Sequence, residues 1–363
     1  MKKSAFLAAA ALSGAAALLL AGCAGSGTPA ATSSGDGEEP AAAGRACVIL
    51  PDAASSPRWE NFDRKYLQEG LEAAGFEVDI QNAQGDTSKY ATIGDQQLTQ
   101  GCGVMLLVDY NGAAVGVAQK AADQGIPVIA YDRPFKADYY VSFDNVEVGR
   151  MEGQTVLDGL EAAGVDPADA AVYYMGGDPA DGNAAMFRSG AVEVMEAAGI
   201  TAVAEPKGVW DGGISQTNFE QALTDNGGKV DGVWAANDTN ADGVIKVLQD
   251  QDITGVAVSG QDANLEGLRN ILTGWQTATV YKPVKLEADK AVEVAIALLN
   301  GESPTADQEL EDGTPYIAVT PQLVGPEQVK DVVAAGDASA DEICTGEIAG
   351  VSLADKCAEF GVE

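Results

Sequence analysis

The chain has 363 residues, 46% of them hydrophobic, which suits two packed domains of about 150 residues each. Its formal net charge of −34 would repel the phosphates of a nucleic acid, so nucleic-acid binding is not expected. Histidine is absent, which excludes His-based acid–base catalysis, a Ser-His-Asp triad and imidazole ligands for a metal.

The N-terminus has the pattern of a lipoprotein signal peptide, residues 1–22. Lys2 and Lys3 precede an uncharged apolar stretch that is shorter than a typical membrane span. The stretch ends in Leu-Ala-Gly-Cys, which resembles a bacterial lipobox and implies transfer of a diacylglyceryl group to Cys23. We therefore expect an extracytoplasmic protein anchored to the cell membrane as a lipoprotein. An ordinary secretion signal with an incidental cysteine is the alternative.

A tether is expected between this signal and the folded body. Residues 23–45 are rich in Gly, Ser, Thr, Ala and Pro. This composition cannot bury a core and predicts a flexible linker. Such a linker would let a globular body range above the membrane surface.

Four cysteines remain in the body of the chain. Outside the cytoplasm an even number suggests two disulfides, and four cysteines allow three pairings. We favour Cys47–Cys102, because Cys47 begins one predicted strand and Cys102 immediately precedes another. We also favour Cys344–Cys357, which closes a short local loop. Free buried thiols are the alternative, and a zinc site is not expected because no Cys-x-x-Cys spacing occurs.

The body alternates apolar strand patterns with helical patterns, and the alternation restarts after about residue 149. Strands are predicted at residues 47–50, 76–81, 104–108, 127–130, 171–174, 201–204, 231–235 and 256–259. Helices are predicted between the first two strands up to about residue 74 and at residues 88–100, 112–124, 149–163, 183–198, 215–225, 239–251 and 264–273. This order predicts an α/β protein with two lobes, each a doubly wound parallel sheet with helices on both faces.

Polar and aromatic residues follow the predicted strands, where open α/β sheets bind ligands. Carboxylates accept hydrogen bonds from sugar hydroxyls, guanidinium groups donate them, amides do both, and aromatic rings cover the C–H faces of a sugar ring. The residues that supply these groups are Trp59, Asp132, Arg133, Arg188, Trp210, Asn237 and Asp262. The sequence therefore predicts a monosaccharide site between the lobes.

The same residues lie in motifs that resemble those of the type I periplasmic sugar-binding proteins, most of all the D-xylose-binding branch. The motifs run in the family's order from about Arg45 to about Lys330: Tyr131-Asp-Arg133, Ser142-Phe-Asp-Asn145, Met175-Gly-Gly-Asp178, Asn237-Asp238, Ser259-Gly-Gln-Asp262 and Thr279-Val-Tyr-Lys-Pro283.

The resemblance implies a role for each site residue. It makes Asp132 and Arg133 the pair that grips sugar hydroxyls, and Arg188 a donor from the second lobe. Asn237, Asp262 and Lys282 are implied as polar ligands, with Trp59 and Trp210 as stacking aromatics and Arg58 and Asn183 as further polar contacts.

The resemblance also implies the division of the chain and its hinge. The N-terminal lobe is expected at residues 46–147 plus 283–315, and the C-terminal lobe at residues 148–282 plus 316–340. Three hinge strands should join them near residues 145–150, 280–283 and 315–320. Residues 341–363, which carry the second cysteine pair, depart from the family pattern and have no implied role.

Each site residue also has a purely structural interpretation. Asp132-Arg133 could form a turn with an exposed ion pair, Arg188 a salt bridge on a helix surface, and either tryptophan could fill a core. Asn237 or Asp238 could cap the helix at 239–251, and Asp262 the helix that follows it. Lys282 could be a solvated hinge residue. Residues 238–243 fit the start of a calcium-binding EF-hand loop, but its twelfth position is Gln249 rather than Glu, so no metal site is expected.

The function implied is that of a substrate-binding lipoprotein of an ABC importer. It would bind xylose or a similar monosaccharide in the cleft and deliver it to a permease, with ATP hydrolysed by a separate subunit. No enzymatic activity or cofactor is expected, and we expect a monomer. A sugar receptor for a chemotaxis or sensor system is the alternative. A related repressor is rejected, because the N-terminus carries an export signal where a repressor needs a helix-turn-helix, and a glycosidase is disfavoured.

Overall fold

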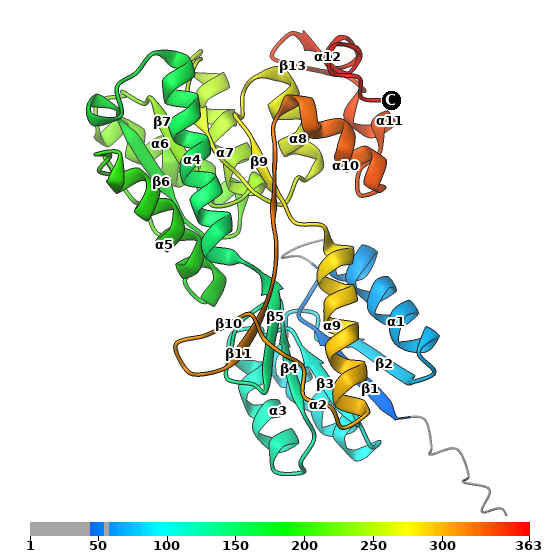
Figure 1. Ribbon diagram of the computed structural model, residues 1–363. Coiled ribbons are helices and arrows are strands. Elements are labelled where there is room, and N and C mark those ends of the chain that lie inside the picture. Colours follow the sequence, from blue (N-terminus) through cyan, green and yellow to red (C-terminus); the bar gives the residue numbers. More distant parts are fainter. Residues whose placement is uncertain (1–43, 54–57) are drawn as a thin grey trace, which may run out of the picture. The chain divides into compact units, whose positions relative to one another are not determined.

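Two parallel β-sheets with helices on their faces organise residues 44–53 and 58–363, the part of the chain that this computed structural model describes (Figure 1). The expected signal peptide, the lipidation site Cys23 and the tether as far as residue 43 lie outside the described residues. Both sheets belong to the same compact unit of the chain. The α/β class expected from the strand–helix alternation is confirmed.

The first sheet has seven strands in the order β10-β11-β5-β4-β3-β1-β2, all parallel except the edge strand β10. Its strands are β1 (Arg45–Leu50), β2 (Glu77–Asn82), β3 (Val104–Leu107), β4 (Val128–Tyr131), β5 (Tyr139–Phe143), β10 (Gln308–Glu309) and β11 (Pro315–Val319). Its helices are η1 (Trp59–Asp63, a π-helix), α1 (Arg64–Ala73), α2 (Thr87–Thr99), α3 (Ala113–Ala122) and α9 (Val284–Leu299).

Alternate residues of the central strand β1 face opposite sides of this sheet, as strand geometry requires. Val48 packs with α1 and α9 in one core, whereas Ile49 packs with α2 and α3 in the other. Both residues are fully buried. A continuous apolar strand between two helical layers is what a parallel sheet needs.

The second sheet is smaller, with the parallel order β6-β7-β8. Its strands are β6 (Val172–Met175), β7 (Gly232–Ala235) and β8 (Ala257–Val258). Its helices are α4 (Asn145–Ala163), α5 (Gly182–Ala197), α6 (Gly212–Asp225), α7 (Asp238–Asp250) and α8 (Leu265–Thr273), and a 3-10 turn, η2, spans Pro167–Asp169. The strand expected at 201–204 is reduced to a single bridge between Ala204 and Tyr173 at the sheet edge.

Three segments connect the two sheets (Figure 1). One runs from β5 into α4, one from β9 (Thr279–Tyr281) into α9, and one from β11 into β12 (Gln322–Val324), which pairs antiparallel with β9. β11 pairs with β5 as far as Val319. Residues 316–319 therefore belong to the first sheet, whereas the expected boundary assigned them to the C-terminal lobe. The rest of the division into lobes stays a prediction.

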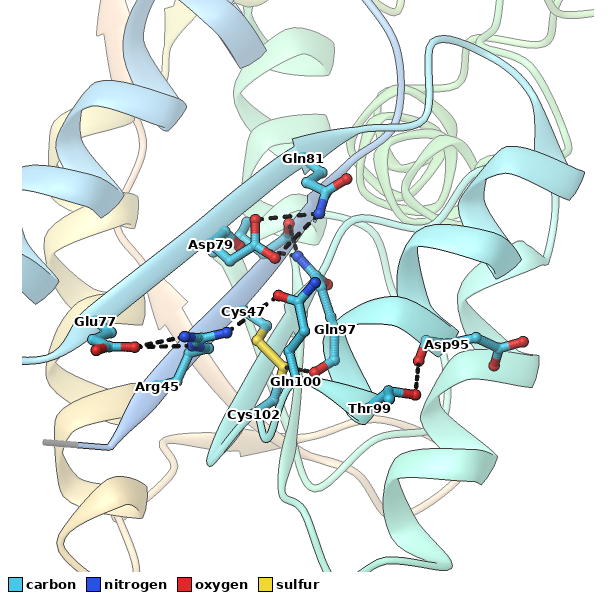
Figure 2. The surroundings of a disulfide bond; sticks show 11 residues. Arg45, Cys47, Glu77, Asp79, Gln81, Asp95, Gln97, Thr99, Gln100 and Cys102 are labelled. Carbon is cyan, nitrogen blue, oxygen red and sulfur yellow. Dashed lines mark hydrogen bonds and ion pairs between the residues drawn. A yellow bond between two sulfur atoms is a disulfide. The ribbon is translucent and has the colours of Figure 1, made fainter. Parts of the chain in front are cut away.

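Both disulfides join the cysteines that the sequence favoured. Cys47 on β1 is bonded to Cys102, which precedes the neighbouring strand β3, with 5.9 Å between their Cα atoms (Figure 2). Beside this bond, Arg45 forms an ion pair with Glu77 at 2.6 Å (Figure 2). Cys344 is bonded to Cys357 with a Cα separation of 5.8 Å.

A helical layer follows the last hinge segment. Its elements are η3 (Pro326–Gln328), α10 (Val329–Ala335), α11 (Ala340–Ile343), β13 (Glu347–Ile348), β14 (Val351–Ser352) and α12 (Leu353–Phe360). Helices α10, α11 and α12 share one hydrophobic core with α8 and β9, and Ile348 of β13 packs against it. Within the described residues, no helix combines the length and apolar character that crossing a membrane requires.

Candidate functional site

One cavity collects side chains from the carboxyl ends of strands in both sheets. Nine of the ten expected ligand-binding residues line it. The twelve lining residues are Arg58, Trp59, Asp132, Arg133, Asp181, Asn183, Phe187, Trp210, Asn237, Gln261, Asp262 and Lys282. A cavity therefore lies where the strand-end rule expected one, while its use as a ligand site and the role of each residue toward a ligand stay predictions.

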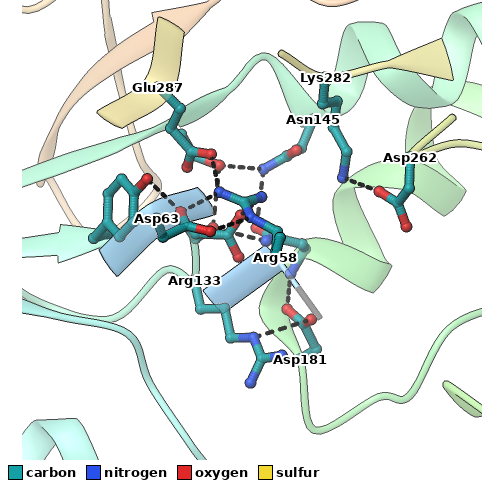
Figure 3. A network of polar contacts seen from close by, with 12 residues as sticks. Arg58, Asp63, Arg133, Asn145, Asp181, Asp262, Lys282 and Glu287 are labelled. Carbon is teal, nitrogen blue, oxygen red and sulfur yellow. Dashed lines mark hydrogen bonds and ion pairs between the residues drawn. The ribbon is translucent and has the colours of Figure 1, made fainter. Parts of the chain in front are cut away.

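Arg58 is the centre of a buried polar network on the first-lobe side of the cavity (Figure 3). Its guanidinium donates to Asp63 at 2.8 and 2.9 Å, to Asp132 at 2.9 Å and to Glu287 at 2.6 Å. The side chains of Asp63 and Glu287 are fully buried. Burial raises the pKa of the Glu287 carboxyl, against the opposing effect of Arg58. A single cation thus holds three carboxyl groups, which fixes the direction of the Asp132 side chain.

Asp132 is held at its backbone as well as at its side chain. Its φ is +63°, a left-handed conformation that Asp tolerates better than most residues. Its carbonyl oxygen accepts from the Asn183 amide at 2.7 Å and from the Ser142 hydroxyl at 3.1 Å. A residue so constrained keeps its remaining carboxylate oxygen in one place, which favours a defined acceptor for a ligand hydroxyl.

Asn183 ties the two halves of the site together. Besides donating to Asp132, its side-chain oxygen accepts from the Asn145 amide at 2.9 Å and from the Tyr140 hydroxyl at 2.8 Å. Because its side-chain nitrogen and oxygen both have protein partners and the residue is 5% exposed, Asn183 supports the cavity wall. It also lines the cavity, so the further contact to ligand that the resemblance implied stays a prediction.

Aromatic rings and cations alternate along the wall. The Trp59 ring lies 4.7 Å from the guanidinium carbon of Arg58 and 5.5 Å from that of Arg133, within cation–π range. Trp210 donates from its indole nitrogen to Asp181 at 3.2 Å, and Arg133 lies 3.7 Å from the same carboxylate oxygen (Figure 3). Burial raises the pKa of the Asp181 carboxyl.

Lys282 and Asp262 form an ion pair at 2.9 Å on the second-lobe side (Figure 3). Burial lowers the pKa of the Lys282 ammonium, but the nearby carboxylates raise it by more, so Lys282 stays charged. The ammonium also lies 5.4 Å from the ring centre of Phe187. Lys282 is therefore not the solvated hinge residue that was one interpretation of the sequence; its side chain is only 11% exposed.

Asn237 takes both of the tasks that the sequence left open between Asn237 and Asp238. Asn237 caps α7, accepting from the Asn240 backbone at 2.8 Å, and also lines the cavity. Asp238 lies fully buried behind it and accepts from Gln276 at 2.7 Å, Thr279 at 2.8 Å and the backbone of Asn264 at 3.0 Å. Burial raises the pKa of the Asp238 carboxyl to about 7. Asp238 therefore joins the segments that carry Asn237, Asp262 and Lys282.

Arg188 is the expected site residue that the structure places elsewhere. Its guanidinium pairs with Glu205 and its side chain is 47% exposed, as in the surface salt bridge that was the alternative interpretation. On α5 the cavity is lined instead by Asn183 and by Phe187, four residues later on the same helical face. The i,i+4 spacing from Asn183 was the signal that could have identified Phe187.

Asp181, Phe187 and Gln261 are the lining residues that the sequence reasoning missed. Asp181 caps α5 and Gln261 lies inside the Ser-Gly-Gln-Asp motif, donating to the backbone oxygen of Ala236 at 2.6 Å. Chemically the cavity offers acceptors, donors and ring faces. Within the described residues, no group of three or more Cys, Asp or Glu side chains is arranged to hold a metal ion.

The comparisons with known proteins define the class. The family model of the periplasmic binding protein domain matches residues 47–303. The chain is 36% identical over 292 residues to the D-xylose-binding periplasmic protein of Escherichia coli (strain K12), covering 76% of this chain and 85% of that protein. The same-named protein of Haemophilus influenzae is 35% identical over 289 residues, with the same coverage.

Solved structures agree with this class. A carbohydrate transporter solute binding protein from Chloroflexus aurantiacus, determined in complex with D-glucose, matches with a TM-score of 0.71 at 26% identity, covering 82% of this chain and 97% of that one. The chain belongs to the periplasmic binding protein family and has the type I fold of that family.

Proposed function

We propose that this protein is the extracytoplasmic substrate-binding lipoprotein of an ABC-type sugar importer and binds a monosaccharide in the cavity between its sheets. The observation that carries the proposal is the cavity lining, in which carboxylates, cations, amides and aromatic rings converge from both sheets. The named ligands of the relatives, D-xylose and D-glucose, support the same ligand class. Xylose is the first candidate, with arabinose, ribose, glucose and galactose as the others.

The cavity suggests how a sugar would be gripped. Asp132 and Asp262 would accept from hydroxyls, Arg133 and Lys282 would donate, and Trp210 would cover a C–H face of the ring. A ligand that lacks a required hydroxyl would leave a polar group of the closed site without that hydrogen bond, which is the source of specificity. Bending of the three connecting segments would close the lobes on the sugar and create the surface that a permease recognises. No chemical step on the sugar is proposed.

A screen of monosaccharides tests the proposal. A ligand that binds only the folded protein stabilises it by about 4 kcal/mol at a thousandfold excess over the dissociation constant, so the melting temperature should rise with one sugar. If no sugar in a panel of pentoses and hexoses shifts the melting temperature, the monosaccharide proposal fails. Loaded protein should then stimulate ATP hydrolysis by its reconstituted permease and ATPase. Stimulation of a sensor protein alone would indicate a receptor instead.

Membrane anchoring through Cys23 has its own test. The lipobox implies that the mature N-terminus is a diacylglyceryl-cysteine. Mass spectrometry of the native protein should find the lipid on Cys23, and Cys23→Ser should move the protein from the membrane fraction to the soluble fraction. Detection of an unmodified Cys23 in a secreted protein would favour an ordinary secretion signal.

A further inference from the structure

Residues 341–363, here called the C-terminal segment, form a small disulfide-closed unit outside the family match at 47–303. The unit consists of α11 from its second residue, the β13–β14 hairpin and α12. The bond between Cys344 and Cys357 closes it. Nothing in the proposed sugar grip uses this segment directly, since no lining residue of the cavity comes from it.

The C-terminal segment completes the hydrophobic core beneath the second-lobe wall of the cavity. Its four most buried core residues are at most 5% exposed: Ile343, Leu353, Cys357 and Val362. They share that core with Ala263 and Tyr281. Ala263 directly follows Asp262 in the chain and Tyr281 directly precedes Lys282, so the core supports both members of the Asp262–Lys282 ion pair.

Hydrogen bonds also connect β9 and α8 to the layer that contains the C-terminal segment. The Tyr281 hydroxyl donates to the carboxylate of Asp337, which follows α10 in the chain. Arg269 on α8 donates to the backbone oxygens of Glu342 and Thr345. The hinge strand β9 and helix α8 are thus both fastened to the layer that the C-terminal segment closes.

The loop that carries Asp262 depends on this support. Asp262 and Ala263 have φ values of +95° and +49°, conformations that side-chain-bearing residues keep only when their surroundings impose them. The loop is bound to β9, since the Asp262 N–H donates to Val280 at 2.9 Å and the Ala263 N–H to the Thr279 hydroxyl at 3.3 Å. Displacement of β9 would therefore displace Asp262.

We propose that the C-terminal segment is a positioning element of the ligand site. It holds β9 and the loop at 262–264 so that Asp262 and Lys282 keep their places on the cavity wall. The hydrogen bond between Tyr281 and Asp337 fastens β9 to the layer that the segment closes, which makes Tyr281 and Asp337 positioning residues. The inference rests on the proposed function only in taking a monosaccharide as the ligand. The positioning itself is a property of the unliganded protein.

Hydrogen exchange of the unliganded protein tests the positioning without any sugar. The double variant Cys344→Ser/Cys357→Ser should exchange about tenfold faster at residues 260–264 and 279–283 than the wild type. The matched control, Cys47→Ser/Cys102→Ser, also loses one disulfide but should leave the exchange of those residues unchanged, because that bond lies in the first sheet. Equal protection of residues 260–264 and 279–283 in both folded double variants would overturn the inference.

A milder pair of variants tests the same point through binding. Tyr281→Phe removes the hydroxyl that donates to Asp337, and the control Tyr173→Phe removes one that donates to the Lys229 backbone at 3.1 Å in the same lobe. With the sugar found in the screen, Tyr281→Phe should weaken binding about tenfold at an unchanged melting temperature, and Tyr173→Phe should not weaken it. Equal dissociation constants for the two variants would overturn the inference. If the wild type bound no sugar, the proposed function would fail. The exchange experiment would still test whether the C-terminal segment positions β9 and the loop at 262–264.

Discussion

At the scale of single residues, the site is defined by charges that hold one another in place. Arg58 binds three carboxyl groups, and Lys282 pairs with Asp262 on the cavity wall. Isolated buried charges are costly, whereas paired ones with further hydrogen bonds keep a fixed geometry. The cavity therefore presents preorganised donors and acceptors, and single substitutions should separate residues that face the ligand from those that do not.

Two arginines provide that separation. Arg133→Ala removes a cation that lines the cavity, and we expect the sugar to bind about tenfold to a hundredfold more weakly, the loss typical of a charge-assisted hydrogen bond. Arg188→Ala removes a cation paired with Glu205 on the surface, and affinity should stay within about twofold of the wild type. Equilibrium titration of both variants is the measurement. A large loss for Arg188→Ala would contradict the placement described here.

Asp238 should make stability depend on pH. Its pKa of about 7 lies above the ordinary value of 3.8, so the folded protein keeps a proton that the unfolded chain releases between those values. Stability from this group is therefore fully present below about pH 4 and is lost as the pH rises through about 7, by an amount on the order of 2–4 kcal/mol.

The variant Asp238→Asn isolates this contribution, because it cannot titrate. Denaturant unfolding of both proteins should show that the free energy of unfolding of the wild type, minus that of the variant, falls from pH 5 to pH 8. The other buried carboxyls with raised pKa values, such as Glu287, act in the same direction but are present in both proteins. An equal difference at the two pH values would show that Asp238 is ionised in the fold.

At the scale of elements, close contact between α4 and α5 determines which residues of α5 line the cavity. A Cβ on Gly190 would lie 2.0 Å from the backbone oxygen of Val146, and one on Gly149 would lie 2.0 Å from that of Phe187. The two helices can approach this closely only through glycine. The contact fixes the rotation of α5, which turns Phe187 toward the cavity and Arg188 toward solvent.

Gly190→Ala tests this contact between α4 and α5. The added methyl group would meet backbone that cannot yield locally, so we expect a loss of about 1–3 kcal/mol in the free energy of unfolding and weaker sugar binding. The matched control is Gly116→Ala on α3, where a Cβ meets nothing within 4 Å. That change should stabilise the protein by about 0.5–1 kcal/mol and leave binding unchanged. Unfolding curves that rank the two variants in the opposite order would contradict this packing.

At the scale of the whole molecule, the sequence predicted the two-sheet architecture and most of the cavity. Buried parallel strands are recognisable as short apolar runs, and the rule that ligands bind at their carboxyl ends located Asp132, Asn237 and Asp262. The strand pattern is regular only as far as β8. The later strands β9, β11 and β12 come from segments that pass between the two sheets, and β11 stays paired with β5 of the first sheet as far as Val319, past the boundary expected near residue 315.

What the sequence could not predict depends on contacts between distant segments. Glu287 reaches Arg58 across 229 residues, and neither position carries a local signal of that pairing. The support of Asp262 by the C-terminal segment is equally non-local. The prediction that Arg188 lines the cavity was wrong for a different reason. A one-residue step on a helix turns a side chain by about 100°, so Phe187 lines the cavity while its neighbour Arg188 does not.

The central claim is that one sugar is gripped from both sheets at once, and calorimetric titration of three proteins tests it most directly. Wild-type protein titrated with the sugar from the screen should bind it one to one. Asp132→Ala at the first sheet and Asp262→Ala beside the second should each weaken binding by at least about tenfold. Absence of binding by the wild type, or a loss confined to only one of the two variants, would contradict a site shared between the lobes.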